Sequence, residues 1–448
     1  FMFKDDEEKL YVTRRSAPLV IGYGKKDVFV GSDAVSLSNL IESVIFLDED
    51  DVAIVSKKQT NIYDKFGERV NRKKKSVDLN SDIISKGNYQ HFMLKEIHEQ
   101  PEVFGYATSS FINFKTHKIE MLNEIKELDN VDRLIFVACG TAYYACAVAK
   151  FWFEKYVKVP VEIDVASEFR YRDTPFSKNE YAIFVSQSGE TADTLAALRK
   201  VKGKVNKTIS IVNVVESSIA RESEFVLPIK AGPEIGVAST KAFTAQLAVL
   251  ACLAINFSNK RGLISRKENS ELIDELVSVP GIMSNIIKKT PIYKEFAKKL
   301  MKAKNALFLG RGILYPLALE AALKLKEISY IHAEGYPSGE LKHGPIALVD
   351  KKMPVICFAP VNNLFEKTIS NVQEVQARNG KVLLITDDEG ASCLNSSEIS
   401  MIKLPKFSNF ISPIIYAIPS QLIAYYTALY KGTDIDKPRN LAKSVTVE

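Results

Sequence analysis

Short apolar runs dominate the first part of the chain. Five of them are rich in β-branched or aromatic residues and are separated by Gly, Asp and Lys, a pattern typical of strands. They cover residues 18–22 (PLVIG), 27–31 (DVFVG), 44–47 (VIFL), 51–56 (DVAIVS) and 61–63 (NIY). We therefore expect a β-rich piece without helices of its own.

These apolar runs stop at about residue 70. Residues 72–75 form a basic cluster followed by Ser, Asp and Asn, which is the composition of a solvated linker. A nucleic-acid patch is the alternative, but no aromatic residues interleave with these charges. A helical pattern resumes over residues 88–101, where we expect Pro101 to end the helix.

From about Leu134 the pattern changes to apolar strands that alternate with amphipathic helices. We expect strands at 133–138, 162–165, 182–186 and 208–214, and helices at 142–156, 191–201 and 243–257. After a basic, helical connector the pattern starts again, with strands at 306–309, 354–359 and 381–386 and a helix at 317–330. This βα alternation predicts open parallel sheets.

The two halves of this region resemble each other. Gly140 corresponds to Gly310, and the strand end at Ser186 corresponds to Ala359, both at an offset of about 170 residues. Residues 168–171 align with 340–343 at a similar offset, which predicts a duplicated domain. The predicted fold class is α/β, with two tandem doubly wound parallel sheets flanked by helices and preceded by the β-rich piece.

Composition narrows the class of protein. The chain has 448 residues, of which 46% are hydrophobic and 25% charged, as in ordinary globular proteins. Its net charge of +6 suits phosphorylated or carboxylated small molecules as well as nucleic acid, and does not select between them. The five cysteines form no C-x-x-C pair, which favours the reduced thiols of a cytoplasmic protein.

Two long uncharged stretches raise the question of a membrane. Residues 242–259 contain Gln246 and Asn256, and residues 410–430 contain two prolines. Buried helices of a large core explain both stretches better than membrane spans do, so we expect no membrane association.

The strongest chemical signal is residues 186–191 (SQSGET), which follow a buried strand and open a helix. The hydroxyls of Ser186, Ser188 and Thr191, with the free N–H groups of the helix N-terminus, predict an anion pocket. Gly189 permits a close approach of the ligand. The loop lacks the lysine of a G-x-x-x-x-G-K-[ST] motif, so a monophosphate fits better than a triphosphate. An ordinary helix cap is the alternative.

Two further turns lie where strands end, the place where ligands of open α/β sheets bind. Residues 139–142 (CGTA) follow the first strand of the sheet, and residues 234–241 (EIGVASTK) lead into a helix. Each turn either belongs to the same pocket or is a plain connection between elements.

The second half carries ionisable residues. Glu320, Lys324 and Glu327 form one stripe of a helix, either as a solvated ion-pair ladder or as a carboxylate held near a lysine for general base catalysis. His343 lies in a loop between Gly and Pro residues, either as a surface residue or as a group that transfers protons near neutral pH. It has no ligand-like spacing to other histidines or to cysteines, so we expect no metal site.

Five sequence blocks follow one another along the chain: 186–194 (SQSGETADT), 234–243 (EIGVASTKAF), 323–334 (LKLKEISYIHAE), 339–345 (GELKHGP) and 436–448 (DKPRNLAKSVTVE). With them, essentially the whole chain resembles the glutamine–fructose-6-phosphate aminotransferases (isomerising). In that family two sugar-isomerase (SIS) domains follow a glutaminase domain whose nucleophile is the first cysteine of the chain. The resemblance implies synthesis of glucosamine 6-phosphate, the first step of hexosamine biosynthesis, without a cofactor.

The same resemblance assigns roles to particular residues. Lys443 would form a Schiff base with C2 of the open-chain sugar, and Glu327 would move the proton between C1 and C2. His343, reaching the site from a neighbouring subunit, would assist ring opening, and Lys324 would lie beside Glu327. The substrate-binding set would comprise Thr141, Ser186, Gln187, Ser188, Thr191, Val237 and Ser239.

The resemblance also divides the chain into the C-terminal part of an Ntn-type glutaminase domain (1–72), a linker (73–105), two SIS domains (106–282 and 283–430) and a catalytic tail (431–448). The chain begins with Phe1, and no cysteine precedes residue 139. We therefore expect that it begins partway through a longer protein and that it lacks glutaminase activity by itself. Ala142, where many relatives have a serine, would remove one hydroxyl from the pocket.

The implied partners are fructose 6-phosphate, glutamine-derived ammonia, and further copies of the chain in a homodimer or larger homo-oligomer. Two other functions stay open. One is an SIS-type sugar-phosphate deaminase or deglycase, against which the amidotransferase remnant argues. The other is a non-catalytic sugar-phosphate sensor, which would need the phosphate pocket but not Glu327, His343 and Lys443 together.

Overall fold

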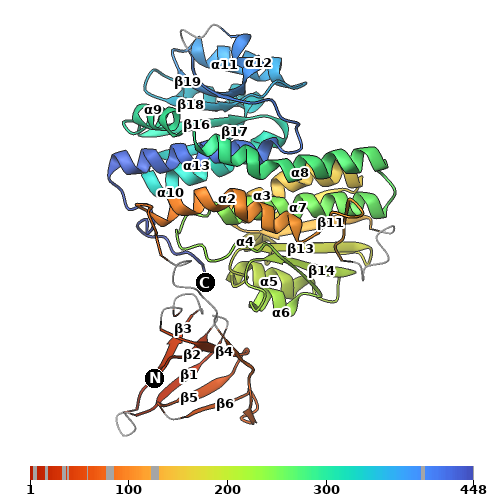
Figure 1. Ribbon diagram of the computed structural model, residues 1–448, viewed down its shortest axis with the longest axis vertical. Coiled ribbons are helices and arrows are strands. Elements are labelled where there is room, and N and C mark those ends of the chain that lie inside the picture. Colours follow the sequence, from red (N-terminus) through yellow and green to blue (C-terminus); the bar gives the residue numbers. More distant parts are fainter. Residues whose placement is uncertain are drawn as a thin grey trace.

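The computed structural model describes residues 1–3, 8–15, 19–32, 37, 40–57, 59–76, 85–122, 131–394 and 399–446. Three parts follow one another along the longest axis of the molecule (Figure 1). The β-rich N-terminal part lies at one end, the first α/β unit lies in the middle, and the second α/β unit lies at the other end.

The N-terminal part consists of two antiparallel sheets with the strand orders β1-β5-β6-β7 and β3-β2-β4-β8. A small apolar core that includes Ile21, Ala53 and Ile62 packs between them. The predicted strands are confirmed with small shifts at their ends, and Pro18 lies outside the described residues. The strands are β1 (Leu10–Thr13), β2 (Val20–Tyr23), β3 (Val28–Gly31), β4 (Ser43–Phe46), β5 (Val52–Val55), β6 (Thr60–Tyr63), β7 (Arg69–Val70) and β8 (Lys74–Ser76).

The basic cluster at residues 72–75 is less solvated than the sequence predicts. The Arg72 guanidinium donates to the Asp51 carboxylate at 2.7 and 2.9 Å, and Lys75 pairs with Glu216 at 3.2 Å. Lys73 and Lys74 are exposed, as expected of a solvated segment. Composition cannot reveal the pairs of Arg72 and Lys75, because their acidic partners lie elsewhere in the sequence. Residues 77–84 of the predicted linker lie outside the described residues.

The prediction that Pro101 ends a helix is wrong. Helix α2 runs from Phe92 to Ser109 with Pro101 inside it. Proline lacks the N–H that would bond the carbonyl of Ile97, and the side-chain amide of Gln100 donates to that carbonyl instead, at 3.1 Å. Burial of Met93 and Phe104 stabilises the helix further, so tertiary packing overrides the local signal.

The first α/β unit has one parallel sheet in the order β12-β11-β13-β14-β15. Its strands are β11 (Arg133–Ala138), β12 (Val161–Val165), β13 (Glu180–Ser186), β14 (Lys207–Val212) and β15 (Phe225–Pro228). Its helices are α3 (Gly140–Trp152), which continues as the π-helical turn η2 (Phe153–Val157), α4 (Ala166–Phe169), α5 (Ala192–Val201), α6 (Ser218–Glu222), α7 (Lys241–Lys260) and α8 (Arg266–Ile287). A short hairpin, β9 (Ile112–Asn113) and β10 (Lys118–Ile119), precedes it.

The second unit repeats this topology, with the order β17-β16-β18-β19-β20, all parallel. Its strands are β16 (Asn305–Gly310), β17 (His332–Pro337), β18 (Pro354–Phe358), β19 (Lys381–Asp387) and β20 (Ser400–Leu404). Its helices are α9 (Thr290–Leu300), η3 (Gly312–Leu314), α10 (Tyr315–Ser329), η4 (Ser338–His343), η5 (Pro345–Leu348), α11 (Phe365–Gln376), α12 (Asp388–Ser392) and α13 (Ser412–Lys431). The identical strand order confirms the predicted duplication.

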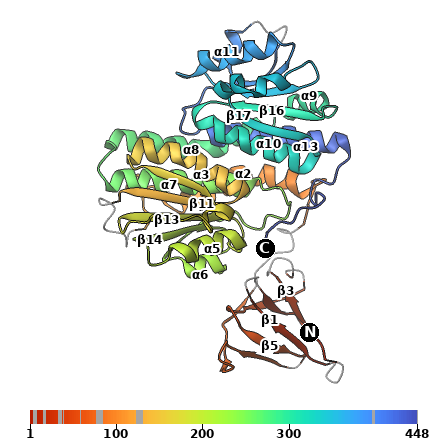
Figure 2. The ribbon, with the colours of Figure 1, turned by 180° about the vertical axis from the view of Figure 1, so that it is seen from behind.

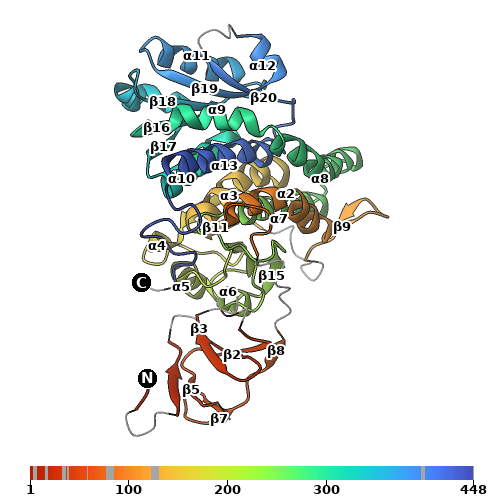
Figure 3. The same ribbon diagram turned by 60° about the vertical axis from the view of Figure 1, so that its left-hand side comes forward.

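The two sheets face each other across a layer of helices that includes α2, α3, α7, α10 and α13 (Figures 1 and 3). These helices belong to one continuous apolar core. Among the described residues, one helix, Lys241–Lys260, is long and apolar enough to cross a membrane, but its apolar window is 94% buried inside the protein. Such burial is what the core helix of a folded domain shows.

Candidate functional site

The SQSGET loop places three hydroxyl side chains at the carboxyl end of β13. Ser186 and Thr191 share a hydrogen bond of 2.9 Å, and the N–H of Gly189 donates to the Ser186 hydroxyl at 3.0 Å. Gly189 has a φ of +66°, which L-amino acids with side chains rarely adopt. The Thr191 side chain does not cap α5, so its hydroxyl is directed to the loop and not to its own helix. The Thr191 hydroxyl is therefore not an ordinary side-chain cap, and the anion pocket stays a prediction.

The C-terminal tail lies against this loop. The Ser444 hydroxyl is 2.9 Å from that of Ser188, and the carbonyl of Val445 accepts a hydrogen bond from the N–H of Ala192 at 3.1 Å. Further back, the Asp436 carboxylate accepts from the first two N–H groups of α2, and its carbonyl accepts from Val237. The end of the chain therefore returns to the middle unit (Figure 2).

Lys443 points from this tail into the turn at residues 234–241. Its Nζ lies 2.5 Å from Oε2 of Glu234, 2.8 Å from the carbonyl of Gly236 and 3.4 Å from the Ser239 hydroxyl. The Lys443 side chain is 24% exposed, and that of Glu234 is fully buried. Burial alone would raise the pKa of Glu234, but the Lys443 ammonium and the N–H groups of Ala242 and Thr240 outweigh it and lower that pKa to about 2.

A second buried carboxylate, Glu96 on α2, supports this turn from behind. Its Oε1 accepts hydrogen bonds from the N–H groups of Ile235 and Gly236 at 2.5 and 3.1 Å. Burial and the neighbouring Glu234 carboxylate raise the pKa of Glu96 to about 7, although Lys443 opposes the shift. Glu96 of α2 thus holds Gly236, the residue whose carbonyl accepts from Lys443.

The predicted stripe on α10 is a buried cluster. The Lys324 ammonium, 1% exposed, lies 2.7 Å from Glu327, 3.4 Å from Glu320 and 3.0 Å from the Thr141 hydroxyl, to which it donates. Burial lowers the pKa of Lys324, but the Glu320 and Glu327 carboxylates outweigh burial and raise it. The alternative of a solvated ion-pair ladder is therefore wrong, because the second unit packs this face of α10 against α3.

One ammonium faces two carboxylates in this cluster, so one carboxyl group can take up a proton. Burial, with repulsion from Glu327, raises the pKa of Glu320 to about 8, against an ordinary value of 4.5. A carboxyl with a raised pKa stabilises the fold below pH 4.5, and this contribution is lost as the pH rises through 8. Glu327, which is 18% exposed at the side chain, is the member of the pair that a ligand can reach.

Glu320→Gln is therefore expected to change the pH dependence of stability. The amide cannot ionise, so the midpoint of thermal unfolding should rise relative to the unaltered protein between pH 5 and pH 8.5. Glu366→Gln, at an exposed position on α11, is the control and should change nothing. Parallel curves for Glu320→Gln and the unaltered protein would contradict the assignment.

The predicted residues fall into two groups, one around Lys443 and one around Lys324. Glu234, the partner of Lys443, is also among the charges that raise the pKa of Lys324, after Glu320 and Glu327. Thr141 joins the Lys324 group from the start of α3. Gln187 is half-buried in the SQSGET loop, and Val237 is half-buried in the turn at residues 234–241.

His343 stands apart within the single chain. It ends η4 and is exposed, and it makes no hydrogen bond to the other predicted residues in the described part of the chain. In the same part of the chain, no group of three or more His, Cys, Asp or Glu side chains is placed to hold a metal ion.

Sequence reasoning missed three supporting residues. Glu234 was noted only as the start of a turn, and Glu96 and Asp436 were not singled out. Glu234 accepts hydrogen bonds from the N–H groups of Thr240 and Ala242, six and eight positions further on, a spacing that no simple capping rule covers. No local signal marks Glu96 or Asp436, because their partners lie more than 100 residues away.

Comparisons with known proteins define the class first. The SIS domain model matches twice, at residues 127–256 and 299–431. The glutamine–fructose-6-phosphate aminotransferase (isomerising) of Bradyrhizobium diazoefficiens is 49% identical over 449 residues, which cover 100% of this chain and 74% of the relative. The enzyme of that name from Brucella abortus is 50% identical with the same coverage. The chain belongs to the glutamine–fructose-6-phosphate aminotransferase family, as its sequence blocks predict.

Solved structures of similar fold support the same family. The C-terminal domain of glucosamine-fructose-6-phosphate aminotransferase from Francisella tularensis has a TM-score of 0.76 and 43% identity, and it covers 79% of this chain and 100% of its own. A glucosamine-6-phosphate deaminase from Thermotoga maritima has a TM-score of 0.62 and 25% identity, with 79% and 99% coverage. The shared region is the pair of SIS domains, so the deaminase likeness alone does not separate the two activities.

Proposed function

We propose that the chain converts fructose 6-phosphate and ammonia to glucosamine 6-phosphate, by amino transfer followed by ketose–aldose isomerisation. The observation that carries this proposal is the position of Lys443. The tail that carries Lys443 also contacts the SQSGET loop, through Ser444. Lys443 can therefore reach the carbon skeleton of a sugar whose phosphate this loop holds.

The residues divide the chemistry between them. The hydroxyls of Ser186, Ser188 and Thr191 hold the phosphate. The sugar is lined by Gln187, Val237, Ser239 and Thr141. The Lys443 ammonium first gives up a proton to water. Its neutral amine adds to C2 of the open-chain ketose, the adduct loses water to give an imine, and ammonia then displaces the lysine amine. Glu327 takes a proton from C1 and returns it to C2, and Lys324 holds this carboxylate in place.

His343 completes the proposal. Its exposure and the absence of contacts to the site within the described chain favour its delivery by a neighbouring copy, where it would assist ring opening. A homodimer or larger homo-oligomer is therefore part of the proposal.

One assay tests the function and its rivals. The chain is incubated with fructose 6-phosphate and either ammonium or glutamine, and glucosamine 6-phosphate is measured. We expect product with ammonium. Binding of the sugar phosphate without product would indicate a sensor. Release of ammonia when glucosamine 6-phosphate is supplied instead, without synthesis, would indicate a deaminase.

A further inference from the structure

A buried arginine joins the N-terminal part to the first SIS unit. Arg14 directly follows β1, and its side chain is 3% exposed. Removing a charge from water is costly unless partners compensate it, so a buried arginine between two domains needs contacts on both sides.

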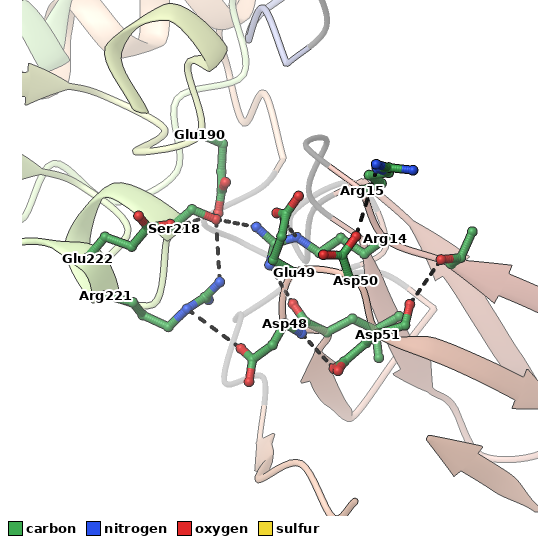
Figure 4. Close-up of polar contacts among 12 residues, drawn as sticks. Arg14, Arg15, Asp48, Glu49, Asp50, Asp51, Glu190, Ser218, Arg221 and Glu222 are labelled. Carbon is green, nitrogen blue, oxygen red and sulfur yellow. Dashed lines mark hydrogen bonds and ion pairs between the residues drawn. The ribbon is translucent and has the colours of Figure 1, made fainter. Parts of the chain in front are cut away.

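Arg14 has such contacts. Its Nη1 donates to the carbonyl of Leu47 in its own domain, and its Nη2 donates to the hydroxyl of Ser218 at the start of α6 (Figure 4). Its Nε lies 3.9 Å from the Glu49 carboxylate. Burial lowers the pKa of Arg14, and among the opposing charges that of Glu190 acts most strongly. Glu190 belongs to the SQSGET loop.

The start of α6 rests directly on that loop. The N–H of Ser218 donates to Oε1 of Glu190 at 2.9 Å, and the N–H of Ile219 donates to the carbonyl of Gly189 at 3.0 Å. A Cβ atom on Gly189 would lie 1.9 Å from the Ser217 hydroxyl oxygen, so the loop and the start of α6 are in close contact at this position. The two hydrogen bonds and this contact couple the position of α6 to that of the loop.

Other polar contacts at this junction are more exposed. Arg221 lies 4.0 Å from Asp48, and Arg199 lies 3.7 Å from Glu49. The side chains of both arginines are at least 34% exposed, and ion pairs of this kind contribute little. Among the described contacts, Arg14 is the buried anchor between the N-terminal part and the loop.

We propose that Arg14 is a positioning residue for the phosphate loop. Through Ser218 and Glu190 it holds the loop in the conformation that binds the sugar phosphate, so that the N-terminal part influences the affinity of a site on the first SIS unit. The inference rests on the proposed function, because it takes the loop as the phosphate site.

The test uses the whole chain with ammonium as the nitrogen donor. Arg14→Ala and Ser218→Ala should each raise the KM for fructose 6-phosphate by about 3- to 30-fold, with kcat changed less than about twofold. The double variant should show no further increase, because both changes break one connection. Arg14→Lys should restore part of the affinity, and Arg15→Ala, at a side chain that is 86% exposed, is the matched control.

The outcomes separate this inference from the proposed function. Calorimetric titration of the unaltered chain with fructose 6-phosphate establishes the site. Absence of binding there would overturn the proposed function and this inference with it. Binding with unchanged KM in both the Arg14→Ala and Ser218→Ala variants would overturn this inference alone, and so would fully additive effects in the double variant. Ser218→Ala keeps the test decisive even if Arg14→Ala fails to fold.

Discussion

Replacing Lys443 with alanine is expected to abolish borohydride trapping of fructose 6-phosphate on the protein and to lower synthesis of glucosamine 6-phosphate by more than about 1,000-fold. Borohydride reduces an imine to a stable amine, so the sugar phosphate becomes covalently attached only where a lysine has added to C2. Mass spectrometry of the reduced protein and a product assay with ammonium measure the two effects. Lys443 is the tail lysine whose ammonium contacts Glu234, Gly236 and Ser239.

The control for this variant is Lys437→Ala. Lys437 lies in the same tail and is exposed. The Lys437→Ala variant should trap the sugar and form product as the unaltered chain does. Persistent trapping in the Lys443→Ala variant would place the imine on another lysine and would remove the observation on which the proposed function rests.

Glu327→Gln should separate the two halves of the reaction. The amide keeps the size of the side chain but cannot accept a proton from C1, so kcat should fall by about 100- to 10,000-fold. Lys443 is untouched by this change, so borohydride trapping should persist. The same product assay and the same mass measurement therefore report on different steps.

Glu366→Gln serves again as the matched substitution, since it makes the same chemical change on an exposed helix of the same unit. It should leave both readouts unchanged. Loss of trapping in Glu327→Gln would mean that this carboxylate is required before the imine forms, and near-normal kcat would exclude it as the base.

Much of the fold can be predicted from the sequence. Parallel strands buried on both faces read as continuous apolar runs, such as residues 133–138, and their alternation with helices predicted the paired sheets. The offset between Gly140 and Gly310 predicted the duplication, which the shared strand order confirms. The end of α2 was predicted wrongly, because the compensation at Pro101 comes from a side chain and from burial that local propensity does not contain.

Part of the candidate site could be predicted from the sequence. The SQSGET loop could be singled out because its residues are neighbours in the chain. The burial of the α10 stripe could not be predicted, since spacing places Glu320, Lys324 and Glu327 on one face of a helix but does not say whether water or α3 covers that face. Their burial decides their charge, and burial is a property of the packed molecule.

The sequence by itself thus determined the repeated α/β units, the hydroxyl loop and the family blocks, because each depends on residues close together in the chain or on their periodicity. Only the tertiary structure decided that Lys443 meets Glu234, that Glu96 supports their turn and that Arg14 reaches Ser218. The partners in these contacts are separated by 209, 139 and 204 residues in the sequence. Contacts between such distant residues exist only once the domains have packed, and no local pattern encodes them.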